Sequence, residues 1–262
     1  MRDITYPPVI VTAKLLFRLL GQRFQLSGTE HVPRKGGALL AINHTGYVDF
    51  IYGGLGANPS KRLVRFMIKR EMMDKPGVGH LLRSFHHIRV DRDSGVQSMR
   101  DATEYLKAGE VVGIYPEATI SRSFEIKELK TGAVRIAAEA GVPLIPVIVW
   151  GAHRLMTKDH PKDFSRSRKT IAVRVGAPLY PTGEDPAAET AELRAEMQRL
   201  LDETLAAYPE DEKAPGSWWT PARLGGSAPT PAEAKLLDAA ELKERAARRA
   251  AKAAEKKDSS TK

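Results

Sequence analysis

A histidine and an aspartate five residues apart are the first pair of side chains that could transfer a proton. His44 and Asp49 flank the segment Thr-Gly-Tyr-Val, directly after an apolar run. Gly46 would let the chain fold back, so that the carboxylate fixes the imidazole tautomer and the other ring nitrogen serves as a general base. In the alternative interpretation, Asp49 caps a helix and His44 is structural. The spacing alone leaves both interpretations open.

A second polar segment, residues 115–123, also follows an apolar run. Its sequence Tyr-Pro-Glu-Ala-Thr-Ile-Ser-Arg-Ser carries several hydroxyl groups and one cation, Arg122. Hydroxyls, exposed backbone amides and a guanidinium are together typical of a phosphate-binding loop. The alternative is an ordinary loop at the exit of a strand.

Alternating strands and helices are expected to position both segments. Apolar runs predict strands at 38–42, 64–68, 88–90, 111–114, 144–149 and 171–175. Helices are predicted at 94–107, capped by Ser94, at 131–140 and at 186–207. This order predicts an α/β fold with a mixed, largely parallel sheet flanked by helices on both faces. Ligands of such sheets bind beyond the carboxyl ends of the strands, where both polar segments would lie.

Composition changes along the chain and indicates four parts. Trp218 and Trp219 lie in a segment rich in Pro, Gly and Ser, and they either anchor it to a groove of the domain or enter a lipid interface. The residues after this segment are basic and rich in Ala, which is typical of a solvated helix or a disordered tail. The predicted parts are an N-terminal amphipathic helix and lead-in (1–30), the α/β domain (31–207), a linker (208–231) and a tail (232–262).

The predicted helix at 7–22 has two possible settings. Lys14 and Arg18 fall on one narrow stripe, and leucines fill much of the rest of the helical wheel. The helix could pack on the core, or it could lie at a membrane interface with its cations among the headgroups. No segment has the roughly 20 apolar residues that span a bilayer, and no secretory signal pattern is present. The sequence therefore predicts a cytoplasmic protein.

Charge and composition narrow the classes of partner and site. The chain has 41 Lys and Arg against 32 Asp and Glu, a net charge of +9. An anionic partner is expected, either nucleic acid, phospholipid headgroups or a phosphorylated small molecule. The absence of cysteine excludes disulfides, thiolate metal sites and cysteine nucleophiles. No HExxH motif or P-loop occurs, and the adjacent His86 and His87 would point to opposite faces of a strand, so no metal site is predicted.

Four short blocks occur in a fixed order along residues 43–147. They are NHxxxxD (Asn43, His44, Asp49), an apolar strand ending in Asp91-Arg92, part of a Phe-Pro-Glu-Gly-Thr-Arg-Ser pattern (Tyr115, Pro116, Glu117, Thr119, Ser121) and the strand Val-Pro-Leu-Ile-Pro-Val, which contains Pro146. Each block alone is weakly specific, whereas four blocks in this order are a strong signal. Together they resemble the PlsC-like 1-acylglycerol-3-phosphate acyltransferase family of glycerolipid acyltransferases.

The third block departs from the family pattern at two positions. Ala118 stands where the pattern has Gly, and Ile120 stands where it has Arg. The family uses that arginine on the phosphate of the acceptor, and isoleucine cannot take this role. Arg122, two residues further on, is the candidate substitute. The alternative is that Arg122 is an ordinary surface arginine.

The resemblance implies transfer of a fatty acyl group to the sn-2 hydroxyl of 1-acylglycerol-3-phosphate, which forms phosphatidate. His44 would be the general base and Asp49 would position it. The other implied site residues are Arg92 and Arg122 on the phosphate, Glu117 and Thr119 positioning the acceptor or its loop, and Asn43, Asp91 and Pro146 in supporting places.

The implied co-substrate is acyl-CoA or acyl-carrier protein, and no cofactor or metal is implied. The other partners would be a lysophospholipid and an anionic membrane surface, with the protein bound peripherally at the inner face of the cell membrane. An alternative keeps the mechanism but uses glycerol-3-phosphate or another lysophospholipid as acceptor. A basic nucleic-acid-binding protein would explain the charge but not the four blocks, and no RNA-recognition motif is present, so no nucleic acid is expected.

Overall fold

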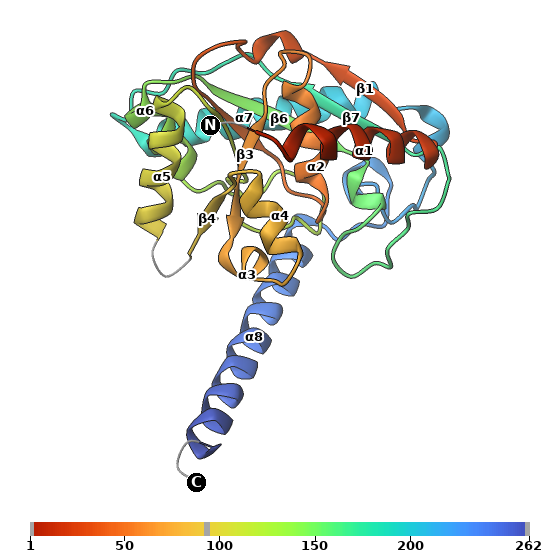
Figure 1. Cartoon of the computed structure of the whole chain (residues 1–262). Helices are drawn as coiled ribbons and strands as arrows, with labels where there is room; N and C mark the ends of the chain where they lie inside the picture. Colours follow the sequence, from red (N-terminus) through yellow and green to blue (C-terminus); the bar gives the residue numbers. More distant parts are fainter. Residues whose placement is uncertain (1–2, 92–94, 260–262) are drawn as a thin grey trace.

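One mixed sheet organises the chain in the computed structural model, which describes residues 3–91 and 95–259. The strands are β1 (Arg23–Ser27), β2 (Ala38–Ile42), β3 (Val64–Lys69), β4 (Ile88–Val90), β5 (Val111–Ile114), β6 (Leu144–Trp150) and β7 (Thr170–Val175). They lie in the order β1-β7-β6-β2-β5-β3-β4. Neighbouring strands are parallel, except for the antiparallel pair β6 and β7. The predicted mixed, largely parallel sheet is confirmed (Figure 1).

Helices cover both faces of this sheet, as predicted. The apolar residues of α5, α6 and α7 form a core with one face, whereas those of α1 and α2 pack on the other. None of the described helices is apolar over a stretch long enough to cross a bilayer. The helices are α1 (Tyr6–Leu19), α2 (Asp49–Gly53), α3 (Arg70–Met73), α4 (Val78–Ser84), α5 (Gly95–Lys107), α6 (Gly132–Ala140), α7 (Pro186–Ala206) and α8 (Pro231–Ser259).

The central strand β2 explains where the polar segments meet. All its residues are buried, because its odd-numbered side chains enter one core and its even-numbered side chains enter the other. Ala41 of β2 lies opposite Ile114 of β5 on one side and opposite Pro146 of β6 on the other. The chain therefore leaves the carboxyl ends of β2 and β5 side by side, which brings residues 43–49 next to residues 115–123.

Some elements differ from the sequence-based expectations. The edge strand β1 and the short helices α2, α3 and α4 were not predicted, and α1 ends at Leu19 rather than at residue 22. The predicted cap Ser94 lies outside the described residues. Asp185 caps α7, because its side chain accepts hydrogen bonds from the backbone amides of Ala187 and Ala188.

The tryptophan pair holds the segment after α7 against the domain. The Trp218 ring stacks on His160 with 3.9 Å between ring centroids. The indole Nε1 of Trp219 donates to the carbonyl of Glu212 at 3.1 Å, and the Arg154 guanidinium lies 4.7 Å from the Trp219 ring centroid. Of the two alternatives for Trp218 and Trp219, these contacts favour the one in which the pair anchors the segment to the domain. The long α8 follows and extends away from the domain (Figure 1).

Candidate active site

His44, in the loop after β2, contacts Asp49 at the start of α2. The Nδ1 atom of His44 lies 3.1 Å from Oδ2 of Asp49. The same carboxylate oxygen accepts hydrogen bonds from the backbone amides of Thr45 and Gly46, at 2.7 Å each. Asp49 is the first residue of α2 and is fully buried. Burial raises the pKa of Asp49, and the hydrogen bonds from His44, Gly46 and Thr45 partly oppose this shift.

The imidazole of His44 is fixed on one side and accessible on another. Its side chain is 21% exposed, and the Tyr115 ring stacks on it with 4.2 Å between centroids. Nδ1 is the ring nitrogen that has a hydrogen-bond partner among the described residues, which leaves Nε2 free to accept a proton. An imidazole held at one nitrogen by a buried carboxylate can act as a general base at the other.

Glu117 fixes the His44 loop from the loop that follows the neighbouring strand β5. Its Oε1 accepts a hydrogen bond from the backbone amide of His44 at 2.9 Å, and its Oε2 accepts one from the amide of Lys127 at 3.3 Å. The amide of Ser121 donates to the carbonyl oxygen of His44 at 2.7 Å. The loop after β5 therefore holds the His44 backbone through both its amide and its carbonyl.

Ala118 and Ile120 show what the two departures from the family pattern do in this loop. Ala118 has a φ of +60°, a left-handed conformation in which glycine is favoured because it has no Cβ. The glycine of the family pattern therefore has a backbone reason, which this chain meets with a strained alanine. The Ile120 side chain is buried in the core. It supplies no charge to the site.

Glu117→Gln should remove a pH dependence of stability that burial creates. Burial raises the pKa of Glu117 from 4.5 to about 8, although the amides of His44 and Lys127 oppose the shift. Between these pH values the unfolded chain ionises this carboxyl while the folded chain keeps it protonated. The free energy of unfolding therefore falls as pH rises through this window, by at most about 1.4 kcal/mol per pH unit.

Urea unfolding of both proteins, followed by circular dichroism across that window, checks this expectation. The unfolding midpoint of the wild type should fall more steeply with rising pH than that of Glu117→Gln. Parallel curves would show that Glu117 is ionised in the folded protein.

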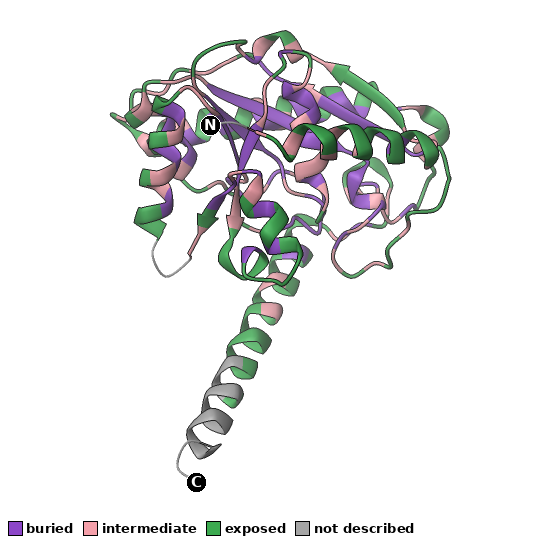
Figure 2. Cartoon of the chain, in the orientation of Figure 1, coloured by how far each residue is buried: buried purple, intermediate pink, exposed green. Residues whose placement is uncertain are grey.

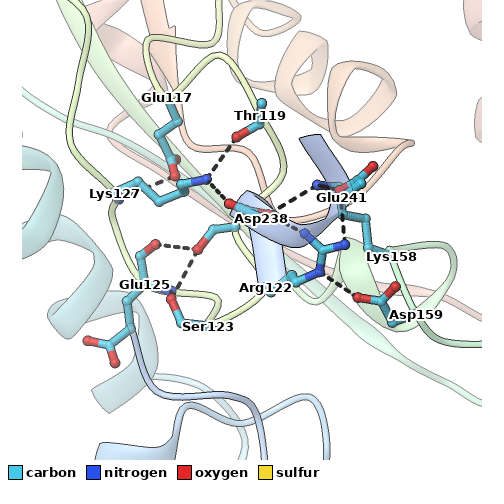
Figure 3. A network of polar contacts seen from close by, with 11 residues as sticks. Glu117, Thr119, Arg122, Ser123, Glu125, Lys127, Lys158, Asp159, Asp238 and Glu241 are labelled. Carbon is cyan, nitrogen blue, oxygen red and sulfur yellow. Dashed lines mark hydrogen bonds and ion pairs between the residues drawn. The ribbon is translucent and has the colours of Figure 1, made fainter. Parts of the chain in front are cut away.

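Three cations gather beside the loop that contains Glu117 (Figure 3). Arg122 is only 8% exposed and its Nε lies 2.5 Å from Oδ2 of Asp159, so it is not the surface arginine of the alternative interpretation. The Nζ atom of Lys127 donates to Oγ1 of Thr119 at 2.8 Å. Lys158 is the third cation, and its side chain is 11% exposed.

Two carboxylates of α8 contact these three cations. Asp238 pairs with Arg122, and its carboxylate oxygens lie 2.5 Å from Nζ of Lys127 and 3.4 Å from Nζ of Lys158. Glu241 lies 3.0 Å from Arg122 and 2.8 Å from Lys158. The tail is therefore not wholly solvated as its composition predicted, because these two acids are partly buried against the domain (Figure 3).

The remaining predicted site residues lie in different surroundings. Asn43 ties β2 to β6, because its side chain accepts from the Val149 amide at 2.7 Å and donates to the Val149 carbonyl at 3.2 Å. Asp91 forms an ion pair with Arg70 at 2.6 Å. Arg92 lies outside the described residues.

Among the residues that the structure describes, no three His, Asp or Glu side chains come together as a metal ion would need.

Lys127 and Lys158 belong to the cation cluster but were not predicted from the sequence. Each is an isolated lysine in a charged stretch, and neither forms part of a spaced motif. Only the packing of the loops after β5 and β6 shows that they lie beside Arg122. The only sequence signal for this cluster was the basic composition of the chain, which does not identify the positions of the lysines that form it.

Comparisons with known proteins agree on one family. The family model described as Acyltransferase matches residues 23–150. A 1-acyl-sn-glycerol-3-phosphate acyltransferase of Bacillus subtilis (strain 168) is 32% identical over 179 residues, which are 65% of this chain and 84% of the relative. The protein of the same name from Pseudomonas aeruginosa is 27% identical, over 71% of this chain and 70% of the relative. The solved 1-acyl-sn-glycerophosphate acyltransferase PlsC of Thermotoga maritima shares the fold, with a TM-score of 0.64 and 22% identity over 78% of this chain and 81% of that one.

Proposed function

The chain belongs to the PlsC-like 1-acylglycerol-3-phosphate acyltransferase family, and from this premise we propose that it acylates the sn-2 hydroxyl of 1-acylglycerol-3-phosphate to form phosphatidate. The observation that carries the proposal is the contact between His44 and Asp49 beside a cluster of cations. A general base next to an anion site suits an acceptor that has both a hydroxyl and a phosphate. The acyl donor is a thioester, either acyl-CoA or acyl-carrier protein.

The proposed mechanism transfers the acyl group in one displacement. Nε2 of His44 accepts the hydroxyl proton as the hydroxyl oxygen attacks the thioester carbonyl carbon. The new C–O bond forms, the C–S bond breaks, and the departing sulfur receives the proton from His44. Asp49 holds the imidazole through Nδ1 and stabilises its positive charge.

We assign the phosphate of the acceptor to the cation cluster formed by Arg122, Lys127 and Lys158. Arg122 has a guanidinium that can form two parallel charge-assisted hydrogen bonds with phosphate oxygens. Lys127 and Lys158 lie close enough to share its carboxylate partners, and so they can share a phosphate. Glu117 positions the loop through its contact with the His44 amide. The family resemblance implies that Arg92 also binds the phosphate of the acceptor, and we retain this proposal.

Thioester release with a panel of acceptors tests the proposed reaction. The full chain is incubated with acyl-CoA or acyl-carrier protein and with 1-acylglycerol-3-phosphate, glycerol-3-phosphate or a lysophospholipid with a larger headgroup. The fastest release is expected with 1-acylglycerol-3-phosphate, and mass spectrometry should identify phosphatidate. Faster release with another acceptor would favour the alternative substrate, and no release with any acceptor would contradict acyl transfer.

The proposed lipid acceptor requires contact with a membrane, and we assign this contact to α1. The helix buries Phe17 against the core. Most of α1 is exposed (Figure 2). Val11, Leu15, Leu16 and Leu19 are each more than half exposed, which leaves an apolar surface on the outside of the helix. The two predicted settings of this helix are therefore compatible, since one side packs on the core and the other can enter an anionic interface.

Leu15→Ser with Leu19→Ser should weaken binding to anionic vesicles at least about tenfold, because two leucines that insert into a lipid interface contribute more than about 1.4 kcal/mol together. Flotation with anionic and neutral vesicles measures the effect. The matched control is Tyr180→Ser with Leu224→Ser, two exposed apolar residues outside α1. Equal binding by the wild type and the α1 variant would show that this helix does not mediate membrane contact.

A further inference from the structure

α8 touches the domain through one narrow stripe. Among its described side chains, Ala234 is buried and Asp238 and Glu241 are partly buried, while the others are exposed. The spacing of these three positions places them on the same helical face. Leu236, Leu237 and Leu242 are 72%, 45% and 62% exposed, so the larger apolar residues bury little of their surface. The helix is therefore held mainly by charge and not by apolar burial.

The cation cluster has an excess charge that α8 neutralises. Arg122, Lys127 and Lys158 supply three positive charges. Within the described part of the domain, Asp159 is the one carboxylate that pairs with them, which leaves an excess of two. A phosphate monoester carries a charge of about −1.5 to −2 near neutral pH. The two carboxylates of α8 bring two negative charges to the same cations, and Glu241 also pairs with Arg245 of its own helix.

We propose that α8 is an autoinhibitory element, whose carboxylates Asp238 and Glu241 occupy the phosphate position of the acceptor. The inference rests on the proposed function, because it takes Arg122, Lys127 and Lys158 as the phosphate ligands. Helix and acceptor then bind in competition. The acceptor phosphate must displace two carboxylates before its hydroxyl can reach the base.

The place where α8 sits supports this competition. A cavity of about 400 Å³ adjoins the cluster and is lined by Tyr47, Arg122 and Lys158 on the side of the domain. Leu237 and Glu241 of α8 form the opposite wall. Tyr47 belongs to the loop that carries the general base. The seated helix therefore contacts the cation cluster at a cavity that the His44 loop also lines.

The contact is suited to reversible release. Asp238 and Glu241 keep 19% and 22% of their side chains exposed, so solvent and salt weaken their ion pairs. Burial opposes ionisation of both groups, but the contacts with Lys127 and Lys158 hold the pKa of each carboxyl below its ordinary value. Both acids therefore remain charged at neutral pH. A released α8 stays attached through the segment that Trp218 anchors to the domain.

Steady-state kinetics of the full chain test the proposal. Asp238→Asn with Glu241→Gln should lower the KM for 1-acylglycerol-3-phosphate and leave kcat and the KM for the acyl donor unchanged. If α8 is seated in about nine of ten molecules, the KM falls about tenfold, and the difference from the wild type shrinks at high salt. The matched control, Glu184→Gln with Glu192→Gln, removes two charges from exposed positions outside α8 and should keep the wild-type KM.

A second measurement reports the position of α8 directly. The chain has no cysteine, so Ala239→Cys gives one site for an environment-sensitive dye. Glycerol-3-phosphate should change the dye signal in a saturable manner and inhibit transfer over the same concentrations, whereas glycerol should do neither. In the Asp238→Asn, Glu241→Gln background, the signal should already be changed without any addition.

The outcomes separate this proposal from the proposed function. A wild type that acylates 1-acylglycerol-3-phosphate, together with a double variant of unchanged KM, would overturn the autoinhibitory role and leave the enzyme assignment intact. Inhibition by glycerol-3-phosphate without any change in the dye signal would also overturn it. A wild type inactive toward every acceptor would instead refute the proposed function.

Discussion

His44→Ala is expected to reduce the rate of acyl transfer by about 10²–10⁴-fold, because it removes the general base from the attack on the thioester. The side chain is partly exposed and its polar contact is with Asp49, so its loss should leave the fold intact. The loop itself is held through the His44 backbone, which the substitution retains. Acyl-CoA consumption with 1-acylglycerol-3-phosphate measures the rate, and urea unfolding followed by circular dichroism measures stability.

His80→Ala is the matched control for this experiment. His80 lies on α4 and is exposed, so the same substitution there should leave the rate unchanged. A folded His44→Ala protein with near-normal turnover would sink the proposed mechanism. A rate loss that accompanies unfolding would instead show that the imidazole holds the loop together.

The central strands could be predicted because burial on both faces leaves a continuous apolar run. Every residue of β2 and β6 is buried, and both runs stand out in the sequence. The edge strand β1 gives no such signal. Four of its five residues are exposed, and it pairs with β7 alone. The short helix α2 was also missed, because five residues are too few to show a helical period.

The site could be predicted where its contacts are local or follow from the order of strands. His44 and Asp49 are five residues apart, so one turn of the chain decides whether they meet. Glu117 comes from a distant segment, but it follows the strand that neighbours β2, and parallel strands end at the same edge of a sheet. Both relations are visible in the sequence before any packing is known.

The cluster around Arg122 could not be predicted in this way. Its members come from the loops after β5 and β6 and from α8, and the contact between Arg122 and Glu241 spans 119 residues. The composition predicted a basic tail, and this net charge gives no indication of the two acidic residues that face the domain. The signal was present only as the spacing of Ala234, Asp238 and Glu241, which lie on one helical face. Nothing in the sequence alone says which face of a tail has a partner.

Asp49→Asn is expected to lower kcat by about 10²–10⁴-fold and to leave both KM values nearly unchanged, because the carboxylate acts on the reaction only through the imidazole. Asparagine keeps one oxygen that can accept the Thr45 and Gly46 amides, so the loop should stay folded. It lacks the charge that stabilises the protonated ring. Asp49→Ala removes the acceptor as well, and each buried amide left without a partner costs roughly 1–3 kcal/mol of stability.

Comparing the variants separates a positioning role from a helix cap. If Asp49 acts through His44, the double variant His44→Ala with Asp49→Asn should be no slower than His44→Ala alone, since the charge has no ring left to orient. The measurement is kcat at saturating donor and acceptor, with urea unfolding of each variant alongside. An Asp49→Asn protein with wild-type kcat would mean that the carboxylate only holds the backbone of its loop. Independent, multiplying losses in the double variant would mean that Asp49 contacts the reaction by a route other than the imidazole.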